Sequence, residues 1–569
     1  MSSTSLPGRL RRDSIGTMLL EAGLVTQDRL ADCLAVASKD QRRVEHVLVE
    51  QGLVDNRQMA LFLGLRYGIP YVNLKRCPIQ PEAIELIPES AARRHVAVPL
   101  STADGTLVVA IEDPTDIEAL DALAAVSRKT IQPVVSTPAD IQAAIRNNYR
   151  SGHEIERHLS QVPVSSVDQE MLDAKSSAEA IADAPVVRAI DLLIRQAIKD
   201  RASDIHIEPQ EDMLRVRYRI DGILHETLSL PLNVHPSLVS RLKIMGGMNI
   251  AERRRPQDGQ IAFPYEGREV DIRVASANTV NGEMIVMRIL DKGFALMTLP
   301  ELGFLPEALK QYEQMLKMPF GMILTSGPTG SGKTTTLYAS MNQLDSMGRN
   351  IITIEDPVEY RFRNINQMQV RPEAGVSFAA GLRACMRLDP DIILVGEIRD
   401  AETARIAVQA ALTGHLVLSS VHANDTSGAL FRLMDLDAEP FLVAQAVIGV
   451  VAQRMVRRIC PYCAQMAPAT PEERLAYERE MGEDCPEFLY GSGCNFCANT
   501  GYLGRMGIYE VMPVSETISR MVLSNARGDE IRAQAIEDGM ISLWRSGMTM
   551  VKKGYTTPRE VLRNVISSA

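Results

Sequence analysis

An eight-residue stretch has the residue types and spacing of a phosphate-binding loop. It follows the apolar run 321–326, precedes a helix-forming segment from residue 335, and reads Gly327, Pro328, Thr329, Gly330, Ser331, Gly332, Lys333, Thr334. The glycines allow backbone N–H groups to surround a phosphate, the helix start adds a favourable dipole, and Lys333 can reach the terminal phosphates. Thr334 is the expected Mg²⁺ ligand. This context favours a nucleoside triphosphate site over a glycine-rich turn that binds nothing.

Carboxylates follow two further apolar runs. Residues 351–354 lead into Glu355, Asp356 and Glu359, and residues 392–395 lead into Gly396 and Glu397. Because a glycine stands where many ATPases carry an Mg²⁺-associated Asp, Glu397 is the candidate to orient or deprotonate the attacking water. The first three carboxylates could help to hold Mg²⁺ through water, and a solvated acidic turn is the alternative.

Two histidines bracket another apolar run, with His415 before and His422 after residues 416–421. A lone histidine beside apolar residues is more often a buried structural group. The strand after an acid-bearing strand can, however, sense the terminal phosphate, which favours function for His422 first and for His415 second.

The cysteines Cys460, Cys463, Cys494 and Cys497 form two C-x-x-C pairs separated by thirty residues. Four soft ligands in this arrangement suit a structural, tetrahedral Zn²⁺ site. A redox pair is the alternative, but no thioredoxin-like βαβ pattern accompanies these cysteines.

Arginines alternate along residues 214–220, where Arg215, Arg217 and Arg219 share one face of a predicted strand. Three cations on one face repel each other unless an anion lies opposite. We interpret them as a basic surface that points at phosphate, with a neighbouring subunit's nucleotide as one candidate source of that phosphate; an exposed strand face is the alternative. Strands at 269–274 and 285–289 complete a mixed sheet with them.

The composition limits the class of protein. The chain has 569 residues, 46% hydrophobic and 23% charged, which predicts several soluble domains. A net charge of −10 argues against a general nucleic-acid binder. No uncharged run of eighteen apolar residues occurs and the N-terminus lacks the pattern of a secretion signal, so we expect a cytoplasmic protein.

The elements that must position these residues suggest an α/β multidomain protein. Residues 13–37 recur at 42–66 with an offset of twenty-nine, and each copy predicts a helix pair. The predicted parts are a tandem helical repeat (1–75), a small α/β domain (76–150), a linker (151–182), an α+β domain (183–300), the nucleotide domain (301–455), a four-cysteine subdomain (456–504) and a helical region (505–569).

The tandem repeat resembles the N-terminal domain of secretion and pilus ATPases that binds cyclic di-GMP. In that family each repeat opens with Arg-Leu-Gly and ends near a Gln. Here the openings are Ser14-Ile15-Gly16 and Arg43-Val44-Glu45, and Ala37 and Arg66 stand at the closing positions. A helical packing domain and a cyclic di-GMP receptor both remain open.

Taken together, the motifs of residues 181–569 resemble the secretion ATPase superfamily, in its type II secretion and type IV pilus assembly branch. The resemblance implies a RecA-like P-loop ATPase domain, a PAS-like domain before it, and a homohexamer that uses ATP and Mg²⁺. It also implies that arginines of the PAS-like domain reach the nucleotide, and Arg217, Arg219 and Arg273 occupy the matching stretches.

The same resemblance implies an inner-membrane platform protein and an accessory docking protein as partners, at the inner face of the inner membrane. The predicted function is ATP hydrolysis that drives assembly of a type IV pilus or a type II secretion pseudopilus. The alternatives are a motor that responds to cyclic di-GMP, a DNA-transfer ATPase of a related system, and a regulatory nucleotide-binding protein with little turnover.

Overall fold

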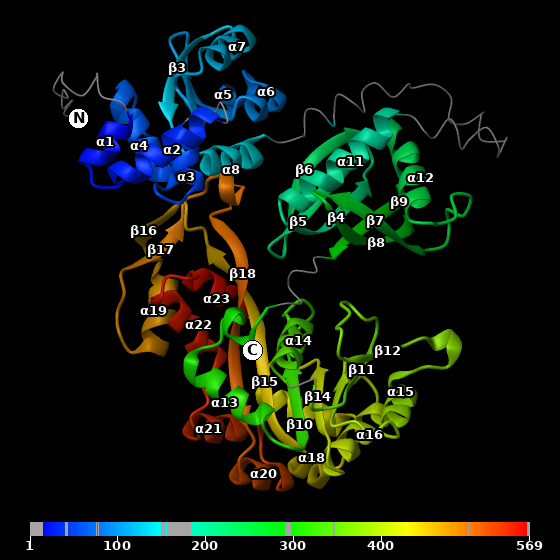
Figure 1. Cartoon of the computed structure of the whole chain (residues 1–569). Coiled ribbons are helices and arrows are strands. Elements are labelled where there is room, and N and C mark those ends of the chain that lie inside the picture. The colour runs from blue at the N-terminus through cyan, green and yellow to red at the C-terminus, as the bar shows by residue number, and fades with distance from the viewer. Residues whose placement is uncertain are drawn as a thin grey trace. The chain divides into compact units, whose positions relative to one another are not determined.

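The computed structural model describes residues 15–39, 44–74, 77, 79–149, 155, 184–290, 297–344, 347–498 and 500–565 (Figure 1). The chain divides into two compact units, Met1–Glu154 with Ser492–Gly501, and Ile155–Gly491 with Tyr502–Ala569. Apart from Ile155, the predicted linker lies outside the described residues. In the described ranges, no helix combines the length and the apolar character needed to span a membrane.

The first unit begins with the predicted repeat of helix pairs. Its helices are α1 (Ile15–Glu21), α2 (Gln27–Lys39), α3 (Val44–Glu50) and α4 (Asn56–Tyr67). Gly23 and Gly52, twenty-nine residues apart, both adopt φ of +69° just after α1 and α3, a left-handed conformation that glycine tolerates. The repeat of helix pairs is therefore confirmed. Ser14 and Arg43 of the repeat openings lie outside the described residues.

A small α/β fold follows in the same unit, as predicted. Its sheet has the order β1-β2-β3, with β1 and β2 antiparallel and β2 and β3 parallel. Its elements are α5 (Pro81–Glu85), α6 (Glu89–Arg94), β1 (Ala97–Ala103), β2 (Thr106–Ile111), α7 (Ile117–Ser127), β3 (Thr130–Val135) and α8 (Pro138–Asn148).

The second unit opens with an α+β fold whose strands have the order β6-β5-β4-β9-β8-β7. Every pairing in this sheet is antiparallel, so the expected mixed sheet is wrong: short connections join β4 to β5, β5 to β6, β7 to β8 and β8 to β9, and the remaining pair, β4 with β9, is antiparallel too. Its elements are α11 (Ala184–Lys199), β4 (Ala202–Pro209), β5 (Met213–Ile220), β6 (Ile223–Pro231), η2 (Leu232–Val234), α12 (His235–Met245), β7 (Gln257–Tyr265), β8 (Arg268–Thr279) and β9 (Gly282–Leu290).

The central sheet of the second unit has the order β12-β11-β13-β14-β10-β15-β18. All its pairs are parallel except β15 with β18. Near-continuous apolar runs explain why β10, β11, β13 and β14 are buried on both faces, whereas the edge strand β12 is polar and partly exposed. The strands are β10 (Gly321–Ser326), β11 (Ile351–Glu355), β12 (Asn366–Gln369), β13 (Ile392–Val395), β14 (Leu416–Val421), β15 (Val447–Ile459) and β18 (Tyr502–Pro513).

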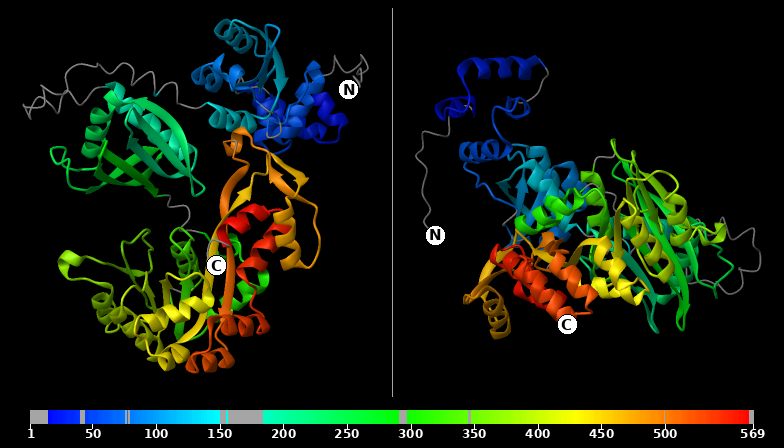
Figure 2. Two further views of the ribbon diagram at one scale, coloured as in Figure 1. Left: turned by 180° about the vertical axis from the view of Figure 1, so that it is seen from behind. Right: turned by 90° about the horizontal axis from the view of Figure 1, so that it is seen from below.

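Helices cover both faces of this sheet. The first face packs on η4 (Leu299–Leu302), α13 (Pro306–Leu316), α14 (Lys333–Gln343), α22 (Leu543–Lys552) and α23 (Pro558–Val565). The second packs on α15 (Phe378–Cys385), α16 (Ala401–Leu412), α17 (Thr426–Asp435), α18 (Pro440–Ala446), α20 (Glu516–Leu523) and α21 (Gly528–Glu537). In Figures 1 and 2 the red helices α22 and α23 lie beside β18 and β15.

The predicted boundary of the C-terminal helical region is wrong by one strand. Residues 505–513 belong to β18, which pairs with β15 from Gly449 opposite Pro513 to Ile459 opposite Tyr502, and helices begin only at Glu516. Ile508, Val511 and Met512 are fully buried because the two helical layers cover opposite faces of this strand. Between β15 and β18 lie β16 (Ala464–Pro468), α19 (Pro471–Met481), β17 (Glu487–Gly491) and η6 (Asn495–Cys497).

Candidate functional site

The carboxyl ends of the parallel strands bring the main candidate residues to one edge of the sheet. β10 leads into the phosphate loop, β13 ends two residues before Glu397, and β14 ends one residue before His422. The register places Ser326 opposite Val421 and Val395 opposite Ser419, so the segments that leave these strands are neighbours. Crevices beyond the carboxyl ends of parallel strands are where such folds bind ligands.

The phosphate loop needs its glycines. Gly327, Gly330 and Gly332 have φ values of +151°, +79° and +90°, and a Cβ at Gly327 would lie 2.5 Å from the hydroxyl of Ser331. The Lys333 ammonium donates to the carbonyl oxygens of Gly327 at 2.8 Å and of Pro328 at 3.2 Å. Thr329, Gly330 and Thr334 are exposed. The loop thus combines a fixed backbone with an accessible surface for phosphate.

Glu397 is the acid whose charge acts on Lys333 of this loop. Its Oε1 pairs with Arg399 Nη2 at 2.6 Å, and its Oε2 lies 3.7 Å from His422 Nε2, while the side chain is 14% exposed. Burial lowers the pKa of Lys333, and the charge of Glu397 opposes this shift. A carboxylate held beside a lysine at the end of a strand can accept a proton from water or orient it.

His422 is the predicted sensor residue that the fold brings to the site. Burial, followed by the positive charge of Lys333, lowers its pKa, and Glu397 acts in the opposite direction. The imidazole is therefore neutral at neutral pH and can offer one donor and one acceptor.

His415 lies at the other end of β14. Its Nδ1 is 2.9 Å from the carbonyl oxygen of Ala410, and its own carbonyl accepts from Gly321 N. Six strand residues separate the two histidines, a length of about 20 Å. The fold therefore does not bring His415 together with Lys333 and Glu397.

The three carboxylates at the end of β11 and just after it lie in different environments. Glu355 is buried and accepts from Tyr338 Oη and Thr353 Oγ1, both at 2.5 Å, and from Gln367 Nε2 at 3.1 Å. Asp356 and Glu359 are exposed, and Glu359 accepts two bonds from Arg273. Within the described ranges, only the four cysteines gather three or more potential metal-ligand side chains.

The predicted arginines have carboxylate partners in the same unit. Arg217 Nη2 lies 2.6 Å from Glu208, and Arg219 Nε lies 3.5 Å from Asp204. Burial alone would raise the pKa of Glu208, but hydrogen bonds from Arg217 and Arg215 lower it overall. The repulsion expected along β5 is thus relieved by acidic side chains of β4.

Arg273 differs from the other two, because its partner lies in another fold of the unit. Its guanidinium donates to both oxygens of Glu359, at 3.1 and 2.9 Å, and both side chains are more than a third exposed.

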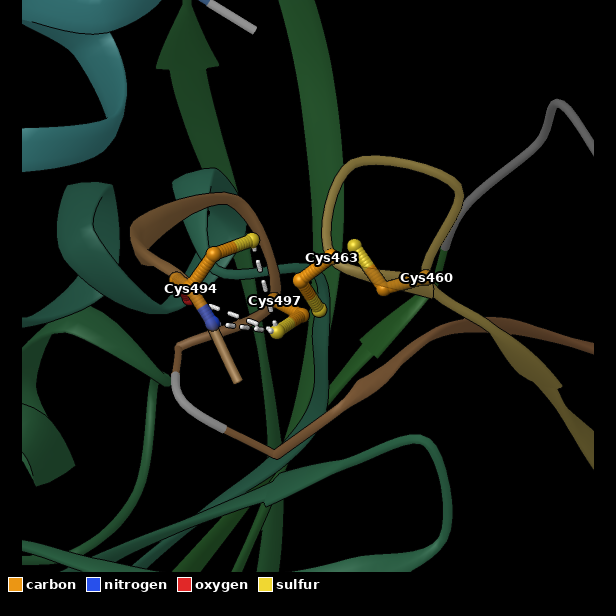
Figure 3. A group of neighbouring side chains, drawn as sticks. All are labelled: Cys460, Cys463, Cys494 and Cys497. Carbon is orange, nitrogen blue, oxygen red and sulfur yellow. Dashed lines mark hydrogen bonds between the residues drawn. The ribbon is translucent and has the colours of Figure 1, made fainter. Parts of the chain in front are cut away.

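The four cysteine sulfurs all lie within 4.8 Å of one another (Figure 3). Cys494 Sγ and Cys497 Sγ are 3.7 Å apart, and the N–H of Cys494 donates to Cys497 Sγ at 3.2 Å. Tetrahedral Zn²⁺ with Zn–S bonds of about 2.3 Å requires sulfur separations of about 3.8 Å. Thiolates are the ligands that structural zinc prefers, so the donor set fits this metal.

Two residues near the site were not predicted from the sequence. Tyr338 donates to Glu355, and Arg454 donates to the carbonyl oxygens of Gln453 at 3.1 Å and Asn424 at 2.7 Å. Burial lowers the pKa of Arg454, against the charges of Asp425 and Glu510. The available signal was a polar Gln453-Arg454 pair inside the apolar run 447–456.

Comparison with known proteins gives two family matches. The model for the Type II/IV secretion system protein family matches residues 179–563, and that for the MshEN domain matches residues 67–155. The second match covers the small α/β fold and begins at the end of α4.

Relatives extend over nearly the whole chain. It is 40% identical over 556 residues to the type IV pilus assembly ATPase PilB of Myxococcus xanthus, covering 97% of this chain and 98% of that protein. It is 38% identical over 570 residues to the type II secretion system protein E of Xanthomonas campestris, covering 97% and 99%.

Among solved structures, the Yersinia pseudotuberculosis ATPase DotB aligns with a TM-score of 0.50 at 19% identity, over 67% of this chain and 94% of that one. This likeness concerns the fold alone and agrees with the predicted RecA-like α/β architecture.

Proposed function

Because the chain belongs to the Type II/IV secretion system protein family, we propose that it is the ATP-hydrolysing motor that drives assembly of a type IV pilus or a type II secretion pseudopilus. The observation that carries this proposal is the convergence of the phosphate loop, Glu397 and His422 at one edge of the sheet. The relatives over nearly the full length are a pilus assembly ATPase and a type II secretion protein, which supports assembly as the work performed.

In this proposal the loop N–H groups and Lys333 bind the β- and γ-phosphates of ATP. Glu397 orients a water molecule and takes its proton, and His422 donates a hydrogen bond to the terminal phosphate. Mg²⁺, held through Thr334, would neutralise phosphate charge. Because Glu355 is already engaged by Tyr338 and Thr353, its proposed role is to fix the end of β11 beside the phosphates.

The proposed assembly is a homohexamer at the inner face of the inner membrane, working on a platform protein with an accessory docking protein. Its α+β domain, with strands β4–β9, would be the PAS-like domain of the family. Hydrolysis would move this domain against the ATPase domain. The proposal includes no nucleic acid, since the net charge of −10 opposes the DNA-transfer alternative.

Cyclic di-GMP binding by the N-terminal region is a second candidate function, which the MshEN match favours. A pocket between the second helix pair and the small α/β fold includes the carboxylates Glu45, Glu50, Glu112 and Asp113. These charges oppose a doubly anionic ligand in that pocket, so another surface would have to supply its contacts. Calorimetric titration of the whole chain with cyclic di-GMP tests this candidate.

Replacing the proposed base tests the motor function. We expect Glu397→Gln to lower the ATP turnover number by about 100-fold or more, because general base catalysis contributes about that much. The Kd for ATP should stay within about threefold of the parent value, since Lys333 and the loop remain. Steady-state hydrolysis and equilibrium binding measure the two quantities.

Glu402→Gln is the matched control, because Glu402 lies on the following helix α16 and pairs with Arg383 rather than with the loop. It should hydrolyse ATP at the parent rate. A Glu397→Gln protein that turns over ATP as fast as the parent would remove Glu397 from the mechanism. A parent protein that does not hydrolyse ATP would refute the motor function itself.

A further inference from the structure

The strand β15 passes directly behind the phosphate loop. It runs parallel to β10, the strand that leads into the loop, with Ser326 opposite Ala452. The next residue, Gln453, is fully buried, and its chain neighbours Ala452 and Arg454 are buried too. A buried amide is costly unless its hydrogen bonds are made, so its partners identify its role.

Gln453 bonds to the loop and to the helix after it, and its backbone lies close to the first loop residue. Its Nε2 donates to the carbonyl oxygen of Ser331 at 2.7 Å, and its Oε1 accepts from Thr336 Oγ1 at 2.9 Å. Its backbone carbonyl oxygen would lie 2.7 Å from a Cβ at Gly327. One residue, more than a hundred positions away in the sequence, therefore contacts the start of the loop, its fifth residue and the helix that follows.

The loop has few other side-chain bonds that could fix its shape. Its backbone turn is closed by Ser331 N to the Pro328 carbonyl at 3.2 Å, and Lys333 bonds to the carbonyls of Gly327 and Pro328. When the ammonium of Lys333 binds phosphate, as proposed above, it exchanges these carbonyl bonds for phosphate oxygens. The bonds of Gln453 lie on the buried side of the loop and do not have to be exchanged.

We propose that Gln453 is a positioning residue that holds the phosphate loop in the conformation that binds nucleotide. It acts through Ser331 and Thr336 and touches no phosphate itself. The inference rests on the proposed ATPase function and adds to it a residue outside the loop. Preorganised donors bind phosphate more tightly because binding then requires less ordering of the loop.

The chemistry of the two bonds explains why an amide is required. The carbonyl of Ser331 needs a donor and the hydroxyl of Thr336 donates to an acceptor, and a carboxamide supplies both at one place. A carboxylate at this position would place one of its oxygens, an acceptor, beside the carbonyl oxygen of Ser331, which is also an acceptor. Methionine has nearly the same length and fills the same space, but it leaves the carbonyl and the hydroxyl without these bonds.

The experiment compares nucleotide affinity in Gln453→Met with that in the parent. The probe is a fluorescent, non-hydrolysable ATP analogue with Mg²⁺, titrated against the full chain, with the folded fraction measured by circular dichroism. We expect the Kd per folded molecule to rise about tenfold or more. The lost buried hydrogen bonds no longer stabilise the loop conformation that binds nucleotide. Thr336→Val should raise the Kd less, because the bond to Ser331 remains.

The double variant Gln453→Met with Thr336→Val shows whether the two residues act together. We expect its Kd to be close to that of Gln453→Met alone, because the first change has already removed the bond to Thr336. If the fold increase in Kd of the double variant equals the product of the two single increases, Gln453 and Thr336 act independently, which would contradict the proposal.

Gln196→Met is the control for the general effect of losing a buried amide. Gln196 is buried in the α+β domain and donates to Asp200 at 2.9 Å, away from the loop. It should lower the melting temperature without changing the Kd. If Gln453→Met keeps the parent Kd, or if Gln196→Met weakens binding equally, Gln453 is a structural residue only. A parent protein that binds no analogue would instead refute the proposed function.

Discussion

At the scale of single residues, the site is a set of charges that change one another's protonation. Lys333, Glu397 and His422 come from three separate segments; the charge of Glu397 acts on the pKa of both other groups, and that of Lys333 acts on the pKa of His422. Glu397 favours the charged forms of Lys333 and His422, whereas Lys333 disfavours the imidazolium of His422. A base and a neutral imidazole can thus exist side by side at neutral pH.

The titration of His422 tests this arrangement. We expect its pKa to lie below the ordinary value of 6.5, because burial and Lys333 disfavour its positive charge. The ¹³C chemical shift of labelled histidine measures it, and the signal that disappears in His422→Gln identifies the residue. Glu397→Gln should lower the pKa further. A midpoint at or above 6.5 would contradict the described environment.

The same shift has a defined effect on stability. The folded pKa of His422 is below the unfolded one, so the unfolded chain binds more protons at acidic pH. The stabilisation linked to this histidine is therefore complete above about pH 6.5 and is lost as the pH falls through the folded pKa. His422→Gln should show a weaker dependence of melting temperature on pH in that range.

At the scale of helices and strands, apolar runs predicted the strands that carry the site, and glycine spacing predicted the loop. The sequence did not contain the order of the strands, because that order depends on which helices cover each face. The sequence ranked His422 above His415 but kept both as candidates, whereas the fold places His415 at the end of β14 away from the phosphate loop. The sequence also could not reveal that Glu208 pairs with Arg217, because Glu208 lies on the neighbouring strand β4.

Strand β18 and Gln453 also depend on residues that are distant in the sequence. Residues 505–513 look like the start of an amphipathic region when read alone, and become a buried strand only because β15 pairs with them. The polar pair Gln453-Arg454 within an apolar run marks the position but does not identify the partners of the amide. Its role depends on Ser331 and Thr336, which are distant in the sequence.

The cysteine cluster gives a prediction at this scale. We expect the purified chain to contain about one Zn²⁺, and Cys460→Ser to lose most of it, because a tetrahedral structural site needs all four thiolates. Atomic absorption measures the metal. The melting temperature should fall by about 5 °C or more, since the metal bridges the ends of segments that lie far apart in the sequence.

Cys485→Ser is the control for this experiment. Cys485 lies between the two C-x-x-C pairs but outside the cluster, and its thiol donates to the carbonyl of Glu487 at 3.1 Å. This variant should keep the metal and the parent melting temperature. Retention of a full equivalent of Zn²⁺ by Cys460→Ser would rule out a four-cysteine site.

At the scale of the whole molecule, the question is where the arginines of the α+β domain act. Arg217 and Arg219 are paired with acids of their own sheet, whereas Arg273 is paired with Glu359 at the end of the β11 segment. Both members of that last pair are more than a third exposed, and such pairs contribute only about 0 to 1 kcal/mol. Arg273 can therefore exchange Glu359 for a phosphate at little cost.

If the chain forms the proposed ring, Arg273 could act on the nucleotide of the neighbouring subunit, and mixed rings test this. Lys333→Ala should be inactive because it cannot bind phosphate, and Arg273→Ala should hydrolyse ATP at least about tenfold more slowly than the parent, because arginines that stabilise phosphate in the transition state contribute that much or more. The two variants, given different tags, are co-expressed and purified through both tags. If Arg273 acts across the interface, the Lys333→Ala subunits supply Arg273 to the intact loops of the Arg273→Ala subunits. The mixed rings then hydrolyse ATP faster than rings of either variant alone.

The matched control pairs Arg273→Ala with a chain that carries both Lys333→Ala and Arg273→Ala. These rings contain intact loops but no Arg273, so their rate per intact loop should stay at that of Arg273→Ala alone. If the first mixture only reaches the average of its two components, Arg273 acts within its own chain. Its bond to Glu359 would then be the functional contact, and the coupling between the two folds would be internal to each subunit rather than a property of the ring.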